Sequence, residues 1–188
     1  MVETPPPRAE LRTKLRAQRQ QFALSPGYPQ AQEALARHLT QVITQLEPQC
    51  LGLYASIRSE FNAVVALGAD SFCDKLPWAL PYCLREKREM HYRQWDRRAA
   101  MVPDECGIAS AAGPLVVPDV VLVPCVGFAT GHYRLGYGGG YFDRFLAVHP
   151  HVTTVGVAWA FSELGAADFA PQAHDIPLSL IVTERGVA

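Results

Sequence analysis

Residues 120–146 read VVLVPCVGFATGHYRLGYGGGYFDRFL, and this stretch decides the fold class of the 188-residue chain. It begins with an apolar run, 120–123, that predicts a buried strand stopped by Pro124. The pattern at residues 141–148 predicts a short helix. Between the two lies a loop that holds four closely spaced glycines, Gly136, Gly138, Gly139 and Gly140. A strand, a glycine-rich loop and a helix in this order are typical of α/β folds.

Helical and strand patterns alternate along the rest of the chain. Helices are predicted at residues 8–24, 30–46 and 62–72. Strands are predicted at residues 50–55, 78–83, 90–95, 152–159 and 178–183, and residues 99–118 are expected to form a loop. This alternation predicts an α/β sandwich with a largely parallel sheet. We expect residues 1–7, with three consecutive prolines, to form a disordered tail and residues 8–188 to form a single domain.

The glycine loop has the composition of an anion site. Glycines let several backbone N–H groups approach one anion, and the helix that follows adds the positive end of its dipole. Arg134 and Arg144 flank the loop as possible phosphate clamps, and Asp143 is a possible Mg²⁺ ligand. The loop is neither a Walker A loop nor a Rossmann fingerprint, because it lacks Gly-Lys-Ser/Thr and has Tyr141 at the third glycine position. The alternative is a tight turn without a ligand.

Composition excludes several other classes of function. A formal charge of −1 gives no sign of a nucleic-acid binder. The five cysteines include no CxxC pair, so zinc is not expected. The first ten residues, MVETPPPRAE, lack the apolar stretch of a signal peptide, and no apolar run is long enough to span a bilayer. We therefore expect a cytoplasmic protein without nucleic-acid or membrane partners, and a monomer.

Residues 134–144, RLGYGGGYFDR, resemble the signature of the 5-formyltetrahydrofolate cyclo-ligases, also called methenyltetrahydrofolate synthetases. Weaker similarity extends from about Arg8 to Glu184. The resemblance implies a three-layer α/β sandwich. It also implies an enzyme that uses ATP and Mg²⁺ to cyclise 5-formyltetrahydrofolate to 5,10-methenyltetrahydrofolate, with release of ADP and phosphate.

The resemblance also implies roles for individual residues. Arg8 and Arg12 would contact ATP phosphates, and Glu60 and Tyr141 would contact the folate. Asp143 and Asp175 would hold Mg²⁺, and Arg134 and Tyr141 would be catalytic. ATP would lie along Arg134, Leu135, Gly136, Tyr137, Gly138, Gly139, Gly140, Tyr141 and Phe142. Without the resemblance, Arg8 and Arg12 would fit a solvated helix face, Glu60 a charge at a helix start, and Tyr141 a packing residue.

The chain departs from the family pattern at four positions, Ala129, His132, Phe142 and Ser179. Ala129 and Ser179 stand where the family has aspartates, and these changes leave open a divergent homologue that binds nucleotide or folate with reduced, altered or no activity. A relative of sugar-phosphate isomerases or CoA-transferases is the other alternative. It would need a catalytic acid or an acid–lysine set in the glycine loop, and none is visible in the sequence.

Overall fold

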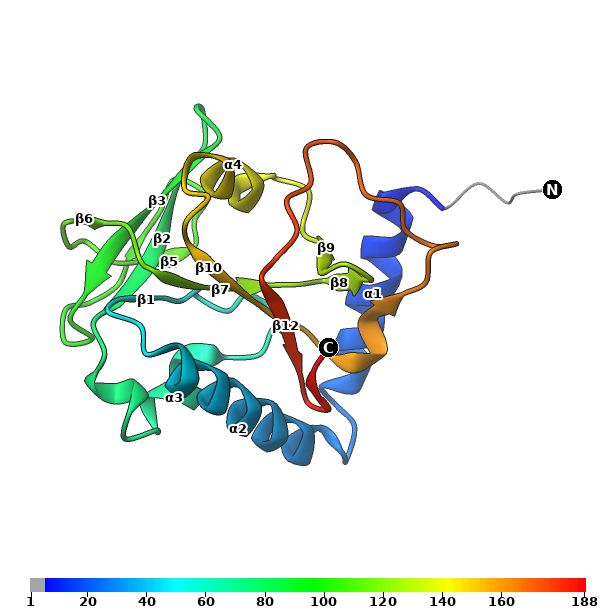
Figure 1. The fold of residues 1–188 in the computed structure, drawn as a ribbon, viewed down its shortest axis with the longest axis horizontal. Coiled ribbons are helices and arrows are strands. Elements are labelled where there is room, and N and C mark those ends of the chain that lie inside the picture. The colour runs from blue at the N-terminus through cyan, green and yellow to red at the C-terminus, as the bar shows by residue number, and fades with distance from the viewer. Residues whose placement is uncertain (1–5) are drawn as a thin grey trace.

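The computed structural model describes residues 6–188, and its centre is a sheet of eight strands (Figure 1). The strand order is β13-β12-β10-β7-β1-β2-β3-β6. In chain order these strands are β1 (Leu51–Gly52), β2 (Trp78–Leu84), β3 (Glu89–Trp95), β6 (Leu115–Val116), β7 (Val120–Pro124), β10 (Thr153–Val157), β12 (Leu180–Thr183) and β13 (Gly186–Val187).

Parallel pairing dominates the middle of this sheet. The four pairs from β12 through β10, β7 and β1 to β2 are all parallel. Antiparallel pairing is confined to the outer strands β13, β3 and β6. The predicted α/β fold with a largely parallel sheet is therefore confirmed.

Helices cover both faces of the sheet. Helices α2 (Tyr28–Leu46) and α3 (Ala63–Gly68) lie on one face, and α4 (Tyr141–Val148) lies on the other (Figure 1). The sheet is covered on both faces because side chains point alternately to either face along a strand, as β7 illustrates. Val120 and Leu122 pack in the core under α2 and α3, whereas Val121 and Val123 pack in the core under α4. This arrangement is the three-layer sandwich that the resemblance implied.

A second, smaller sheet was not predicted. It has the order β11-β8-β9, built from β8 (Gly127–Ala129), β9 (Tyr133–Leu135) and β11 (Glu163–Leu164). Strands β8 and β9 form a hairpin whose turn has positive φ at Gly131 (78°) and His132 (60°). Helix α1 (Arg8–Phe22) packs Leu11 and Leu15 against this small sheet. The hairpin strands, of three residues each, are too short to produce a strand signal of their own.

Most other element predictions are confirmed, with differences in length. The helix predicted at 62–72 stops at Gly68 and is followed by a 3₁₀ turn, η1 (Cys73–Lys75). The strand predicted at 50–55 is only two residues long. The loop predicted at 99–118 is wrong, because it contains β4 (Val102–Pro103), β5 (Ala109–Ser110) and the edge strand β6. Of the predicted tail, residues 1–5 lie outside the described residues, and Pro7 already forms the N-cap of α1.

The connections leave a crevice at the carboxyl ends of β1 and β7. Strand β1 leads through α3 to β2 on one side, and β7 leads through α4 to β10 on the other. The chain therefore winds in opposite directions from these two neighbouring strands, which is where open α/β sheets bind ligands. No helix of residues 6–188 is long and apolar enough to cross a membrane.

Candidate active site

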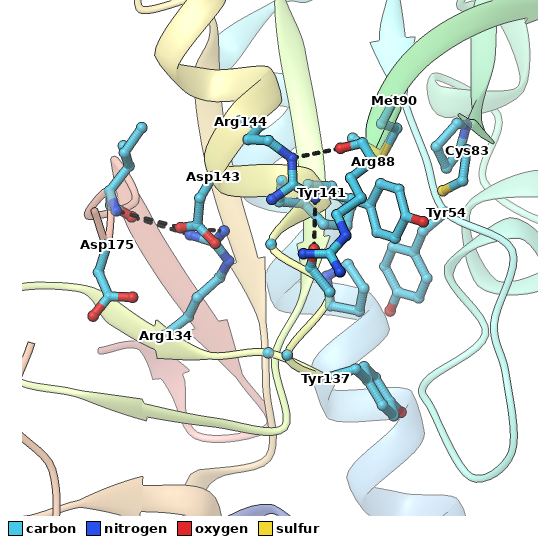
Figure 2. A pocket seen from close by; sticks show the side chains of 18 of the residues that line it. Tyr54, Cys83, Arg88, Met90, Arg134, Tyr137, Tyr141, Asp143, Arg144 and Asp175 are labelled. Carbon is cyan, nitrogen blue, oxygen red and sulfur yellow. Dashed lines mark hydrogen bonds and ion pairs between the residues drawn. The ribbon is translucent and has the colours of Figure 1, made fainter. Parts of the chain in front are cut away.

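A cavity of about 910 Å³ opens at this crevice. Its floor comes from the ends of the parallel strands, with Tyr54 after β1 and Pro124 at the end of β7. The glycine loop and α4 form one wall, and the start of α1 and residues 172–176 complete it. Figure 2 shows two different ends: Arg134, Asp143 and Asp175 lie on one side, and the larger, less charged side chains of Tyr54, Cys83 and Met90 lie on the other.

The glycine loop has a backbone that only glycine adopts easily. Gly138 has φ +94° and Gly140 has φ +66°, in the left-handed region where other residues are strained. A Cβ on Gly140 would lie 2.7 Å from Nη1 of Arg144. A Cβ on Gly136 would meet nothing within 4 Å, and its φ is not in that region. Gly138 and Gly140 are therefore required by the backbone, whereas Gly136 leaves open space beside the cavity.

Arginines hold the loop from both sides. Nε of Arg12, on α1, donates to the Gly136 carbonyl at 2.8 Å. Nη2 of Arg144, on α4, donates to the Gly139 carbonyl at 2.6 Å, and its Nε donates to the Arg88 carbonyl. The amino end of α4 has no side-chain cap, so its first N–H groups are available to a ligand. These cations and donors suit a phosphate chain.

Arg134 is the most buried cation of the charged end. Its residue is 7% exposed, and Nη2 lies 2.8 Å from Oδ1 of Asp143. Nη1 donates to the Ile176 carbonyl at 3.0 Å, so β9, α4 and the segment before β12 meet at this guanidinium. Arg134 therefore holds these three segments together and also places a positive charge at the cavity lining.

Arg8 and Asp175 form a second pair in the same region. Nη1 and Nη2 of Arg8 donate to Oδ1 and Oδ2 of Asp175 at 3.0 and 2.5 Å. Burial by itself would raise the pKa of Asp175, but the hydrogen bonds from Arg8 and from the Gln172 N–H outweigh it and lower this pKa below its usual value. Arg8 and Asp175, which the resemblance assigned to the ATP phosphates and to Mg²⁺, therefore neutralise each other's charge in the free protein.

The two aspartates differ as metal ligands. Both contacts of the Asp143 carboxylate, from Arg134 and from the Ile176 N–H, fall on Oδ1. Asp175 has both oxygens engaged by Arg8 and Gln172. Among residues 6–188 no three His, Cys, Asp or Glu side chains gather to hold a metal by themselves. Mg²⁺ that accompanies a nucleotide needs only one or two carboxylates, so Asp143, which lines the cavity and has contacts on Oδ1 alone, fits this role better than Asp175.

Glu60 also lines the cavity, close to Tyr137 of the glycine loop, and is 8% exposed. Oε2 accepts a hydrogen bond from the Ile57 N–H at 2.8 Å, whereas Oε1 is buried without a partner in the described part of the chain. Burial raises the pKa of Glu60, and the Ile57 N–H, the Tyr137 hydroxyl and Arg19 oppose this rise. A buried carboxylate with an oxygen that lacks a partner is a strong hydrogen-bond acceptor.

Tyr141 stands between the two ends, at the start of α4 (Figure 2). Its hydroxyl lies 3.3 Å from Sγ of Cys106. This contact, together with burial, raises the pKa of Tyr141 to about 12. The hydroxyl therefore keeps its proton near neutral pH and is able to donate a hydrogen bond.

The structure brings together nearly all of the residues predicted for the site. Arg8, Arg12, Glu60, Arg134, Asp143 and Asp175 line the cavity, as do all residues from Gly136 to Phe142. Leu135 does not, because its side chain is 1% exposed and packs in the core with Leu11 and Leu15.

The positions that depart from the family pattern also lie outside the cavity lining, Phe142 excepted. Ala129 is buried in the core of the small sheet. The Ser179 hydroxyl accepts a hydrogen bond from the Thr154 N–H at 3.0 Å, and the Thr154 hydroxyl accepts one from the Ser179 N–H at 2.8 Å. Ser179 therefore links β10 to the segment before β12. His132 occupies the left-handed turn position of the β8–β9 hairpin.

Sequence reasoning missed several residues that line the other end of the cavity. They lie shortly after β1, within β2, or at the start of the segment 104–108; they are Tyr54, Pro81, Cys83 and Asp104. The available signal was topological, since Tyr54 lies two residues after β1, where the chain winds in opposite directions from neighbouring strands. Arg19 was also missed, because a cation in a helix normally indicates a solvated face.

Comparison with known proteins gives one family. The model of the 5-formyltetrahydrofolate cyclo-ligase family matches residues 6–184. The 5-formyltetrahydrofolate cyclo-ligase of Mycoplasma pneumoniae is 37% identical over 68 residues, which cover 36% of this chain and 40% of that relative's length.

Two solved structures have the same fold. The 5,10-methenyltetrahydrofolate synthetase of Aquifex aeolicus superposes with a TM-score of 0.74 at 28% identity, covering 96% of this chain and 91% of the other. The corresponding synthetase of Mycoplasma pneumoniae gives a TM-score of 0.73 at 21% identity, covering 95% and 99%. With nearly the whole chain matched by the family model, this protein belongs to the 5-formyltetrahydrofolate cyclo-ligase family.

Proposed function

We propose that this protein cyclises 5-formyltetrahydrofolate to 5,10-methenyltetrahydrofolate and that the reaction converts ATP to ADP and phosphate. The observation that carries the proposal is a 910 Å³ cavity that is lined both by the cationic glycine loop and by the buried Glu60 carboxylate. Such a cavity suits two substrates of opposite character, a polyanion and a heteroaromatic ring. Membership of the family supports the same reaction.

The phosphates of ATP would lie against the glycine loop. Backbone N–H groups of residues 138–142 and the uncapped start of α4 would bind phosphate oxygens, and Arg12, Arg134 and Arg144 would neutralise their charge. Arg8 would join them once the incoming phosphates compete with Asp175 for its guanidinium.

The pterin ring of the folate would lie at the opposite end. A carboxylate matches the adjacent ring N–H and amino group of a pterin, which are two donors side by side, and Glu60 is a carboxylate in the cavity lining. Tyr54, Cys83 and Met90 would pack against the ring faces. Tyr141, between the two ends, would donate its hydroxyl hydrogen bond to the folate near the reacting formyl group.

The chemistry requires positioning more than a protein nucleophile. The formyl oxygen attacks the terminal phosphorus of ATP, and the bond from that phosphorus to the bridging oxygen of ADP breaks. The neighbouring folate N–H nitrogen then attacks the formyl carbon and loses its proton, and inorganic phosphate leaves with the former formyl oxygen and that proton. Arg134 would stabilise the charge on the transferred group, and Arg134 and Tyr141 would hold the two reactants in line.

Mg²⁺, when bound, supplies further charge neutralisation on the phosphates, and Asp143 is the residue best suited to hold it. Asp175 would contribute only after release from Arg8. The cytoplasmic location and the monomeric state stay predictions.

The test is a spectrophotometric assay of methenyltetrahydrofolate formation from 5-formyltetrahydrofolate, with ATP and Mg²⁺ present, and with ATP omitted as the control. We expect an ATP-dependent rise in absorbance. ATP binding by calorimetry without any rise would contradict the proposal and favour a nucleotide-binding homologue with another substrate. Absence of both would remove the ATP assignment.

A further inference from the structure

A buried arginine outside the main cavity lining has no counter-ion. Arg19 lies on α1 and is 4% exposed. It forms no ion pair with a carboxylate in residues 6–188. A buried charge without a partner is costly and indicates a specific arrangement of neighbours. Its hydrogen-bond partners are both neutral, since Nε donates to the Ser59 hydroxyl at 3.3 Å and Nη2 donates to the Tyr137 hydroxyl.

These two partners come from the two ends of the site. Tyr137 belongs to the glycine loop, between Gly136 and Gly138, whereas Ser59 directly precedes Glu60. The Arg19 guanidinium also lies 5.8 Å from the centre of the Tyr137 ring, so it contacts both the hydroxyl and the face of this side chain. Arg19 therefore connects the phosphate end of the cavity with the folate end.

Arg19 and Glu60 also face one another. Both line a small internal void of about 10 Å³, together with Tyr54 and Cys125. Glu60, whose Oε1 is buried without a hydrogen-bond partner in the described residues, and Arg19 therefore border the same void. The Tyr137 hydroxyl is close enough to Glu60 to lower the pKa of that carboxyl.

We propose that Arg19 is a positioning residue that acts through Tyr137 on Glu60, and so keeps the Glu60 carboxylate ionised and oriented for the folate. Without Arg19, only burial and the remaining dipoles would act on Glu60, and burial favours the neutral acid. The inference rests on the proposed function only in assigning the folate to Glu60.

Several other groups act on the same carboxyl and have to be kept constant. The titratable and charged groups that face Glu60 are Arg19 from α1, Tyr137 from the glycine loop, Arg58 from its own loop, Tyr54 after β1, and Cys125 after β7. The thiol and the two phenols carry raised pKa values, so they stay neutral through the acidic range, and Arg58 stays charged. Of these groups, only Glu60 changes its protonation state in the acidic range.

The first experiment needs no catalysis. The protein is labelled with ¹³C at glutamate side-chain carboxyls, and the Glu60 signal is assigned by its loss in Glu60→Gln. We expect the Glu60 titration midpoint to rise by about one pH unit in Arg19→Met, and by less in Tyr137→Phe. Lys14→Met, which removes an exposed cation from the same helix, should leave the midpoint unchanged.

The second experiment measures the effect on folate binding. In Arg19→Met the acidic limb of kcat/KM for 5-formyltetrahydrofolate should move upward by the same amount, and KM for the folate should rise more than KM for ATP. Arg19→Lys should bring the pH profile part of the way back to that of wild type, because lysine restores the positive charge but not the planar guanidinium that contacts both Ser59 and Tyr137. A purely structural Arg19 would lower activity without moving the pH profile.

An unchanged Glu60 midpoint in folded Arg19→Met and Tyr137→Phe would overturn the proposal. Should the arginine variant fail to fold, the Tyr137→Phe titration decides, because it breaks the same link with a smaller change. A wild-type protein without cyclo-ligase activity would count against the proposed function alone, since the titration is measured on the free protein. An active wild type with unmoved midpoints would count against the role of Arg19 alone.

Discussion

Arg8 and Asp175 are 167 residues apart in sequence, and they form a bidentate ion pair across the cavity mouth, with N–O distances of 3.0 and 2.5 Å. Arg8 also donates to the Ala170 carbonyl and lies over the Phe169 ring. The first turn of α1 is therefore fastened to the segment that precedes β12. If the phosphates of ATP recruit Arg8 as proposed, they have to loosen this connection, and ligand binding is then coupled to the position of residues 168–176.

Replacing Asp175 tests how much this pair stabilises the free protein. Because the folded state lowers the pKa of Asp175, its contribution is fully present above the unfolded pKa and is lost as the pH falls through the folded value. We expect Asp175→Asn to lower the free energy of unfolding by about 1–2 kcal/mol at pH 7. The difference from wild type should shrink below about pH 4. Urea unfolding at several pH values measures it.

The matched control for this change is Asp168→Asn, an exposed aspartate of the same segment. It should leave the free energy of unfolding within about 0.5 kcal/mol of wild type at every pH. Equal losses in both variants would mean that net charge, and not the pair with Arg8, accounts for the effect.

Arg134 is better tested with lysine than with alanine. Alanine would leave Asp143 unpaired and empty a site that is 7% exposed, so loss of activity would be mixed with loss of structure. Lysine keeps the charge and removes the planar fork that contacts Asp143 and the Ile176 carbonyl. We expect Arg134→Lys to lower kcat by about 10²–10³-fold, measured by the methenyltetrahydrofolate assay.

Arg97→Lys is the control for the arginine-to-lysine change. Arg97 pairs with Asp74 away from the cavity lining, so its loss of the fork should leave kcat unaffected. Retention of wild-type kcat in Arg134→Lys would show that Arg134 acts on substrate only as a charge.

The glycine loop offers an internal comparison. Gly138→Ala forces a Cβ into a φ of +94° and within 3.2 Å of Cζ of Arg12, so we expect a loss of about 1–2 kcal/mol in unfolding free energy. Gly136→Ala meets no atom within 4 Å and should leave stability unchanged. Its new methyl group borders the cavity, however, and should weaken ATP binding measured by calorimetry. If folded Gly136→Ala bound ATP as tightly as wild type, the nucleotide would not contact the loop at residue 136.

The sequence predicted the elements whose signals are local. The apolar run 120–123 and the helix at 141–148 are long or periodic enough to be recognised, and β7 and α4 match them closely. The hairpin β8–β9 carries Arg134 but has strands of only three residues, which form because Leu135 packs against α1. A contact of that kind depends on the tertiary structure.

The candidate site shows the same division. The glycine loop is one continuous segment, so the residues of the phosphate end could be listed from the sequence. The folate end is assembled from residues after β1, on β2 and β3, and in the segment 104–108, which only the sheet order brings together. In the sequence Arg19 has the pattern of a surface cation, because its partners Ser59 and Tyr137 are distant along the chain.

Glu60 should be costly for the free protein and necessary for folate binding. Burial raises its pKa even though Arg19, Tyr137 and the Ile57 N–H oppose this rise, so ionising it costs the folded state more than the unfolded chain. That cost is absent below the unfolded pKa and fully present above the folded one. We therefore expect Glu60→Gln to raise the free energy of unfolding by about 0.5–2 kcal/mol at pH 8, and the gain should vanish near pH 4.

The same variant should bind 5-formyltetrahydrofolate at least about tenfold more weakly, because an amide cannot accept from both donors of the pterin edge. Glu163→Gln, at an exposed position of β11, is the control and should change neither quantity. Stability is measured by urea unfolding at pH 4 and pH 8, and affinity by calorimetry. A Glu60→Gln protein that is less stable than wild type at pH 8 would show that the carboxylate is held mainly by its partners, because the sign of the change depends on whether burial or the neighbouring donors dominate at this site.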